Sequence, residues 1–242
     1  MISEAKAASP DPNKSEEDVI AAIRELLKKH LVFQFNATFI DFCKKKLKIP
    51  ANEVYRILYS LVQRKILVPG SILTREEILE NSTRTAILKI IQANPGIHVR
   101  ELCQKIEMNN SVVRSHLKVL ETFNYIRRRD YANPKITLLF TKEFPDKYDD
   151  FFVIWKSETD RQIIQLLLRE ELNITEFSAK LQLHHSTIQY HIEKLSKFDM
   201  LVKESKDQSV KFRFNTEKLG VFDEFLALIT SPALHEAQNR TP

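Results

Sequence analysis

The sequence predicts a mainly α-helical protein with small β-hairpins, built from a short unit that is repeated along the chain. The first observation is an internal repeat: residues 111–129 recur seventy-five positions later as residues 186–204, without a gap. The second is the spacing of apolar residues, which recur at intervals of three and four around each repeat. The third is size, because 242 residues can hold two or three small domains. Self-similarity at a fixed offset indicates that one supersecondary unit occurs more than once.

Each repeat is predicted to fold as a helix, a short turn, a second helix and a basic hairpin. This is the arrangement of a helix-turn-helix followed by a wing, so we expect tandem winged helix-turn-helix domains, three units in all. Upstream, the match continues with a slip of one residue, which places Ile87 on Ile163. The aligned pairs include Glu101 and Glu176, Ser111 and Ser186, His116 and His191, Leu120 and Leu195, and Phe123 and Phe198.

Composition narrows the class of protein. The net charge of +5 and the isoelectric point near 9.1 mildly favour a polyanionic partner. The three glycines are too few and too scattered for a glycine-rich phosphate loop, and Cys43 and Cys103 make no disulfide framework. No apolar run approaches the length of a membrane span, and the N-terminus lacks a signal-peptide core. We therefore expect a cytoplasmic protein without a cofactor.

The first unit is predicted to cover residues 15–73, after a disordered tail at 1–14. Its elements are expected to be a helix from an N-cap at Ser15 to His30, a short strand at 31–35, helices at 38–47 and 50–64, and a short hairpin within 66–73 that turns at Pro69-Gly70. In the third helix Val54, Leu58 and Leu61 align with Val113, Leu117 and Leu120 of the next unit. The hairpin of this unit carries no charge.

The second unit is predicted to cover residues 74–145, and it opens with a capping box of Thr74 and Glu77. Helices are expected at 82–93 and 99–106, and a third helix, capped by Ser111, at 111–123. Strands at 125–129 and 136–141 would form the wing around a polar loop.

The third unit is predicted to cover residues 157–230, joined to the second by an aromatic linker helix at 146–156 and followed by a polar tail at 231–242. Its expected elements are a short strand at 172–174, helices at 175–181 and 186–198, wing strands at 201–204 and 210–214, and a last amphipathic helix at 220–229.

The repeated third helix is the predicted contact with nucleic acid, because a helix in the major groove needs polar side chains near its N-terminus. The second unit offers Asn109, Asn110, Ser111, Arg114, Ser115 and Lys118 there, and its wing adds Arg127, Arg128, Arg129 and Lys135. The third unit offers His185, Ser186, Thr187, Gln189, Tyr190 and Lys194, and its wing adds Lys203, Lys206, Lys211 and Arg213. Wing cations suit phosphates or the minor groove, although a basic wing can also be a solvated guard against strand pairing.

The remaining polar residues do not indicate catalysis. His116 and His191 lie beside core leucines and are expected to be half-buried, and the two cysteines are expected to be buried. A metal site from His184, His185 and His191 is disfavoured because helical spacing does not bring these side chains together. No Ser-His-Asp, CxxC, HExxH or Walker pattern is present, so we do not expect an enzyme.

Residues 73–128 resemble the winged helix-turn-helix regulators common in archaea, of the broad ArsR/MarR-like kind. The resemblance rests on the Asn81-Ser-Thr-Arg84 motif, the Asn94-Pro-Gly-Ile-His98 motif and the helix that contains Ser115-His116-Leu117. It extends to the third unit through STIQYHIEKL, and together the two units cover about residues 73–215. The resemblance implies that the third helix enters the major groove and that the wing flanks it. Where the family has a glycine before the wing, this chain has Asn124 and Asp199, which tolerate the same left-handed backbone.

Two functions are compatible with the sequence. The first is a non-enzymatic DNA-binding protein, a transcriptional regulator that occupies double-stranded DNA. The second is a protein-interaction adaptor, because winged helices resembling these also serve that purpose in endosomal sorting complex II and in RNA-polymerase-associated factors. The uncharged first wing, the acidic Glu53 and Glu193, and the aromatic linker favour a protein partner. The sequence predicts neither the oligomeric state nor the DNA site.

Overall fold

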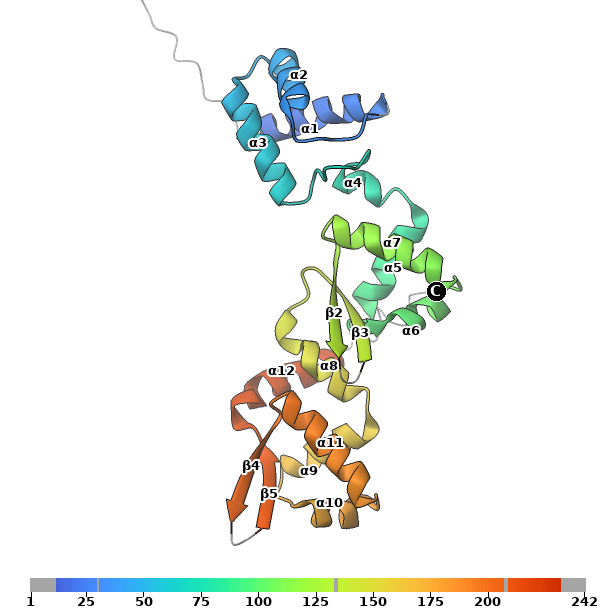
Figure 1. Ribbon diagram of the computed structural model, residues 1–242, viewed down its shortest axis with the longest axis vertical. Helices are drawn as coiled ribbons and strands as arrows, with labels where there is room; N and C mark the ends of the chain where they lie inside the picture. The colour runs from blue at the N-terminus through green and yellow to red at the C-terminus, as the bar shows by residue number, and fades with distance from the viewer. Residues whose placement is uncertain (1–11, 30, 133–134, 207–208, 232–242) are drawn as a thin grey trace, which may run out of the picture. The chain divides into compact units, whose positions relative to one another are not determined.

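The computed structural model describes residues 12–29, 31–132, 135–206 and 209–231, and it divides the chain into two compact units (Figure 1). The larger unit holds residues up to Lys142 apart from a short connection at Ala93–Gly96, and the smaller unit holds that connection and everything from Glu143 onward. The predicted class, mainly α with small β-wings, agrees with the elements observed in both units.

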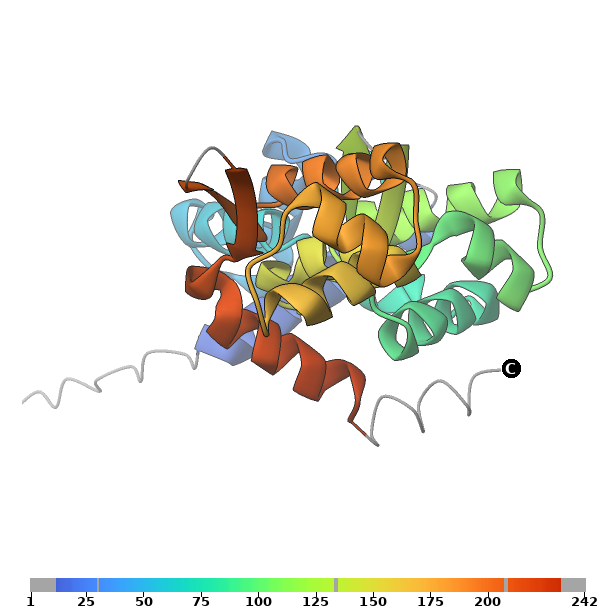
Figure 2. The same ribbon diagram turned by 90° about the horizontal axis from the view of Figure 1, so that it is seen from below.

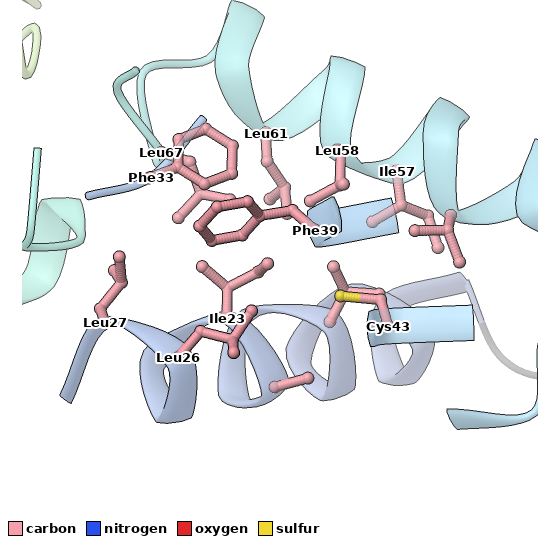
Figure 3. Close-up of a cluster of buried hydrophobic side chains, with 13 residues drawn as sticks. Ile23, Leu26, Leu27, Phe33, Phe39, Cys43, Ile57, Leu58, Leu61 and Leu67 are labelled. Atoms are coloured by element: carbon pink, nitrogen blue, oxygen red, sulfur yellow. The ribbon is translucent and has the colours of Figure 1, made fainter. Parts of the chain in front are cut away.

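The larger unit begins with three helices, α1 (Pro12–Lys28), α2 (Ala37–Leu47) and α3 (Ala51–Gln63). They enclose one hydrophobic core, in which side chains of α1 and α3 point toward each other with Phe33 and Phe39 between them (Figure 3). The two phenylalanine rings meet edge to face, with centroids 5.3 Å apart. Burial raises the pKa of the Cys43 thiol to about 11, so this predicted core cysteine stays protonated.

Three predictions for this part of the chain are wrong. Helix α1 begins at Pro12, so Ser15 is not its N-cap; the rest of the predicted N-terminal tail, 1–11, lies outside the described residues. No strand forms at residues 31–35 or 66–73. The two segments meet only around Phe33, whose amide donates to Ser71 O at 2.9 Å and whose carbonyl accepts from Gly70 N at 2.9 Å. The segment around the Pro69-Gly70 turn is too short to continue this pairing into a ladder.

The same unit continues with α4 (Arg75–Ile78), α5 (Ser82–Ala93), β1 (Ile97–His98), α6 (Val99–Lys105), α7 (Asn110–Thr122), β2 (Ile126–Ala132) and β3 (Lys135–Thr141). A second hydrophobic core joins these elements around Leu102, Leu117 and Leu139. The capping box of Thr74 and Glu77 is confirmed: the Thr74 side chain is fully buried and its amide donates to Glu77 Oε2 at 2.7 Å. The wing strands are longer than predicted, and β1, which pairs with β3, was not predicted.

The smaller unit contains the 3-10 turn η1 (Asp146–Tyr148), α8 (Asp149–Trp155), α9 (Glu158–Leu167), α10 (Ile174–Leu181) and α11 (His185–Lys197). It continues with β4 (Leu201–Lys206), β5 (Ser209–Phe214), the 3-10 turn η2 (Thr216–Lys218) and α12 (Leu219–Ile229). Strands β4 and β5 run side by side in Figures 1 and 2. The strand predicted at 172–174 is reduced to a single bridge between Leu172 and Phe212, because α10 already begins at Ile174. The predicted C-terminal tail, apart from Ser231, lies outside the described residues.

Aromatic rings on α8 and α12 pack against one another in the smaller unit. The ring of Phe225 stacks on Phe151 with centroids 5.3 Å apart and meets Phe152 and Trp155 edge to face at 5.1 and 5.8 Å. The aromatic side chains of the predicted linker helix, α8, therefore pack against α12.

The left-handed residues recur at aligned positions. Outside glycine, positive φ occurs at six of the described residues, and these fall into two sets of three that are related by the sequence offsets 59 and 75. One precedes the third helix, at Lys48, Glu107 and Gln182, with φ of 57°, 53° and 56°. The other follows it, at Lys65, Asn124 and Asp199, with φ of 57°, 60° and 56°. The left-handed backbone expected at Asn124 and Asp199 is thus confirmed.

Candidate nucleic-acid interface

Helix α7 begins one residue before the predicted start and is capped by a different residue. Asn109, not Ser111, is its N-cap, and its side-chain oxygen accepts from Val112 N at 3.1 Å and from Ser111 Oγ at 2.7 Å. This cap holds the first turn of the helix, where free backbone N–H groups favour an anion. Val113, Leu117 and Leu120 are fully buried and fix the opposite face on the core.

The outward face of α7 carries every residue that the sequence predicted for it. All six side chains are exposed, namely Asn109, Asn110, Ser111, Arg114, Ser115 and Lys118. The Arg114 Nε donates to Asn110 Oδ1 at 2.7 Å, which directs the guanidinium along the helix surface. An arginine beside an amide on an exposed first turn has the donors and acceptors that base edges require.

The three wing arginines of β2 do not share one face, because neighbouring side chains of a strand point to opposite sides. Arg127 lies over the Phe140 ring at 4.4 Å, and Arg129 is exposed and lies 5.3 Å from the Tyr131 ring. Arg128 instead turns toward α7 and donates to Glu121 Oε2 at 3.0 Å. Lys135 begins β3, opposite Ala132. The half-buried Arg127 and the exposed Arg129 therefore share one face of the wing.

A cleft of about 800 Å³ lies between the start of α7 and the wing. Arg114 and Asn110 line one side, and Tyr131 lines the other. Arg100, from the first turn of α6, adds an exposed cation that was not in the predicted set. Its place in the sequence could have identified Arg100, because it lies two residues after β1, at the start of the second helix. In a helix-turn-helix the N-terminus of the second helix lies on the same side of the domain as the third helix. The other lining residues are His98, Val99, Asp130, Ile136 and Thr137.

His116, on the side of α7, is half-buried as predicted. Burial, and to a lesser extent the charge of Arg84, hold the pKa of this imidazole below its usual value of 6.5. His116 therefore adds no positive charge to the interface at neutral pH.

The corresponding helix α11 presents a different surface. His185, Ser186, Gln189 and Tyr190 are exposed and Thr187 is half-buried. Gln189 and Glu193 occupy the positions that Arg114 and Lys118 hold in α7, and the Gln189 amide donates to Glu193 Oε1 at 3.1 Å. The surface cation pair of α7 is thus replaced by a polar pair with one negative charge.

Lys194 is committed to the interior of the smaller unit. Its ammonium group and His191 Nδ1 both contact the carboxylate of Asp160, which is fully buried; the His191 distance is 2.6 Å. Only 10% of the Lys194 side chain is exposed. Lys194 is not available to bind a phosphate, because moving away would leave the buried carboxylate of Asp160 unpaired at a large cost in free energy.

The wing cations of the smaller unit also have acidic neighbours. Arg213 Nε lies 2.5 Å from Glu204 Oε1, and Lys211 Nζ lies 3.9 Å from Glu176 Oε1. Lys203 is exposed, and Lys206 ends β4. Residues 157–230 contain ten Lys or Arg and twelve Asp or Glu, a net charge of −2. Residues 74–145 contain twelve and eight, a net charge of +4, so of these two segments residues 74–145 attract a polyanion and residues 157–230 do not.

Within the described ranges, His, Cys, Asp and Glu do not gather in groups of three or more that could hold a metal ion. In the same part of the chain, none of the helices combines the length and the apolar character that crossing a membrane requires. Cys43 is buried as expected, whereas Cys103 is only half-buried.

A family profile described as winged helix-turn-helix DNA-binding matches residues 80–127. These residues cover α5, β1, α6, α7 and the first residues of β2. The cleft is also lined by residues of β2 and β3 beyond the match, namely Asp130, Tyr131, Ile136 and Thr137. This segment is a winged helix-turn-helix domain. Its third helix is α7, and its wing is the β2–β3 hairpin.

Similarity to one other protein extends beyond this domain. The chain is 26% identical over 180 residues to an uncharacterized HTH-type transcriptional regulator of Methanocaldococcus jannaschii. The match covers 74% of this chain but 44% of the relative, so the chain spans less than half the length of that protein.

Some solved structures are similar to parts of this chain. NolR from Sinorhizobium fredii is 16% identical with a TM-score of 0.31, and HlyU from Vibrio cholerae is 23% identical with a TM-score of 0.31. Each match covers 35% of this chain, and 85% and 91% of the respective structures. The transcriptional regulator SlyA is 18% identical with a TM-score of 0.27, over 60% of this chain and 89% of its own. Scores at this level support no fold assignment.

Proposed function

We propose that this protein is a DNA-binding transcriptional regulator that contacts double-stranded DNA through its winged helix-turn-helix domain. The observation that carries the proposal is the cleft lined by residues between His98 and Thr137, where Arg100 stands on α6 and Arg114 on α7. The exposed Arg129 precedes the lining residue Asp130 on the wing strand β2. In this arrangement α7 lies in the major groove, with Arg114, Asn110 and Ser111 toward base edges. Lys118 and the wing arginines Arg127 and Arg129 meet phosphates.

The proposal includes three helical units in tandem, of the ArsR/MarR-like kind, with the predicted boundaries 15–73, 74–145 and 157–230. Support comes from the left-handed residues, because Lys48, Glu107 and Gln182 are separated by the offsets of 59 and 75 that align the sequences. Lys65, Asn124 and Asp199 repeat the same offsets at the other end of each third helix. A left-handed non-glycine residue is uncommon, so its recurrence at both helix ends favours one shared unit.

The three units are not equivalent in this proposal. The second unit supplies the sequence-reading helix. The exposed residues of α11, namely His185, Ser186, Thr187, Gln189 and Tyr190, take at most a secondary role beside Lys203, because the surrounding charge is negative. We leave Lys194 out of the interface. The function requires no reaction chemistry, and a regulator works in the compartment that holds the DNA, in line with the predicted cytoplasmic location.

The test is binding of the purified chain to random and genomic duplex DNA at two salt concentrations. Binding that weakens steeply with salt, together with tight binding to a few genomic fragments, is the expected result. Arg114→Ala should weaken binding to those fragments by about 1–3 kcal/mol and relax the preference at one base pair. Lys89→Ala, which removes an exposed cation from α5, is the matched control and should change the affinity little.

The alternative is a protein-interaction adaptor that does not contact DNA. The observation in its favour is the smaller unit, whose net negative charge and internally paired wing cations suit a protein better than a duplex. Absence of duplex binding at low salt would select this function, and a search for protein partners would follow.

A further inference from the structure

Helix α3 carries two tyrosines where the DNA-contacting helix carries two cations. With the offset of 59 that aligns the first two units, Tyr55 falls on Arg114 and Tyr59 falls on Lys118. Both tyrosines lie on the outward face of α3, with 50% and 49% of their surface exposed. The inward positions keep their apolar character, since Val54 and Leu58 are fully buried. The substitution therefore changes the outer surface of the helix without changing its core.

The two tyrosines form an aromatic ladder with Phe35, from the segment before α2. The rings of Tyr55 and Tyr59 are nearly parallel, with an interplanar angle of 12° and centroids 6.4 Å apart. The Phe35 ring lies 5.1 Å from Tyr55 at an angle of 34°. Two exposed rings held parallel on a rigid helix present flat faces at fixed spacing, the geometry on which planar groups stack.

The surroundings of the ladder are basic and polar. Arg56 lies next to Tyr55 on the exposed side of α3, and the exposed residues Asn52 and Gln63 flank the ladder along the same helix. Glu53, half-buried, is the single acid of α3. Residues 15–73 contain ten Lys or Arg and six Asp or Glu, a net charge of +4. The exposed cations just before α3 are Lys44, Lys45, Lys46 and Lys48, of which Lys46 forms an ion pair with Glu25.

The size of the ladder argues against a second copy of the chain as its occupant. Two half-exposed tyrosines and the partly buried Phe35 offer at most on the order of 300 Å², given about 150–250 Å² for a fully covered ring. A stable protein–protein interface needs about 800 Å² from each partner. A small exposed aromatic surface in a basic setting fits a flexible polyanion with planar groups instead.

We propose that the aromatic ladder binds unpaired nucleotides of single-stranded DNA or RNA. The bases would stack on Tyr55 and Tyr59, and the phosphates would meet Arg56 and the lysines at the end of α2. Stacking on aromatic side chains tolerates any base, so this site contributes affinity without reading sequence. The inference does not depend on duplex recognition by α7, because the two sites use different helices and different cores.

The test is binding of the full chain to a fluorescent single-stranded oligothymidylate of about 12 nucleotides, a length within the usual site size. We expect Tyr55→Ala/Tyr59→Ala to weaken this binding about ten- to a hundredfold, and Tyr55→Phe/Tyr59→Phe to retain it because the rings remain. The control is Ile72→Ala, which shortens an apolar side chain elsewhere in residues 15–73. Ile72 is 52% exposed, as the tyrosines nearly are, and this variant should bind as the unmodified chain does. Circular dichroism would verify that each variant is folded.

Two outcomes would overturn the proposal. One is absence of single-strand binding at low salt, and the other is single-strand binding that survives the double alanine substitution. The variant Arg114→Ala keeps this result separate from the duplex proposal. It should lose duplex affinity but retain single-strand affinity, whereas the double tyrosine variant should do the reverse.

Discussion

At the residue scale, one histidine position lies in two opposite electrostatic surroundings. His116 on α7 and His191 on α11 are aligned, and the slip of one residue upstream aligns Arg84 with Asp160. The positive charge of Arg84 thus acts on His116, whereas His191 Nδ1 lies 2.6 Å from a carboxylate oxygen of Asp160. The sequence predicted both histidines as half-buried packing residues, and burial agrees. It did not predict the charged partner, because Asp160 is 31 residues from His191 in the chain.

The lowered pKa of His116 gives a pH dependence with a definite sign. Since the folded state binds this proton less readily than the unfolded state, lowering the pH below about 6.5 favours unfolding, and the effect is complete below the folded-state pKa. Arg84→Met removes the charge contribution, so its free energy of unfolding should fall less steeply with decreasing pH. Urea unfolding between about pH 7 and pH 5 measures this, with Lys89→Met as the control on the same helix. An unchanged pH slope in Arg84→Met would contradict the contribution of Arg84 to the lowered pKa of His116.

At the element scale, the wing shows how strand geometry sorts a run of identical residues. Three consecutive arginines indicate a basic hairpin, and a hairpin is present. Because neighbouring side chains of a strand point to opposite faces, Arg128 points toward α7, where Glu121 accepts its hydrogen bond. Arg127 and Arg129 lie on the other face of the wing. The composition of the wing was predictable from the sequence. Its division into two faces depended on the register of β2, which the predicted strand ends did not give.

Single alanine substitutions should separate the two faces of the wing. Arg129→Ala should reduce the slope of log affinity against log salt by about 1, because one phosphate contact is lost. Arg128→Ala should leave that slope nearly unchanged and lower the free energy of unfolding by up to about 1 kcal/mol, the range of a partly exposed ion pair. Duplex titrations at several salt concentrations, with urea unfolding of each variant, give both values. Equal salt slopes for the two variants would show that the faces do not differ in their contact with DNA.

At the scale of the whole molecule, charge is divided unevenly along the chain. Residues 15–145 contain twenty-two Lys or Arg and fourteen Asp or Glu, a net charge of +8, whereas residues 146–230 contain twelve and fifteen, a net charge of −3. The sequence predicted helix positions well where apolar spacing is regular, as in α5, whose predicted bounds of 82–93 agree with the structure. It failed at the 31–35 and 66–73 segments, where apolar β-type residues are present but no strand forms. Their isolated pairing at Phe33 depends on a tertiary contact that local sequence does not specify.

The buried carboxylate Asp160 should affect the smaller unit alone. Asp160→Ala leaves Lys194 buried without its counter-ion, which we expect to cost about 3–5 kcal/mol. Trp155, the single tryptophan of the chain, lies in this unit, so its fluorescence reports unfolding there. The tryptophan transition should move to lower urea, while duplex binding at low salt stays unchanged. Glu158→Ala, which removes an exposed carboxylate of the same helix, is the control, and loss of duplex binding in Asp160→Ala would contradict this prediction.

The third helices also bear on how such a chain can diversify. Each uses the same inward positions for its core, while the outward pair is Tyr55 and Tyr59 in one, Arg114 and Lys118 in the next, and Gln189 and Glu193 in the last. Since the outward pair is exposed and carries little of the packing, exchanging these two side chains changes the surface that the helix presents at little cost in folding. The outward pair of such a helix can therefore vary independently of the residues that hold the helix in place.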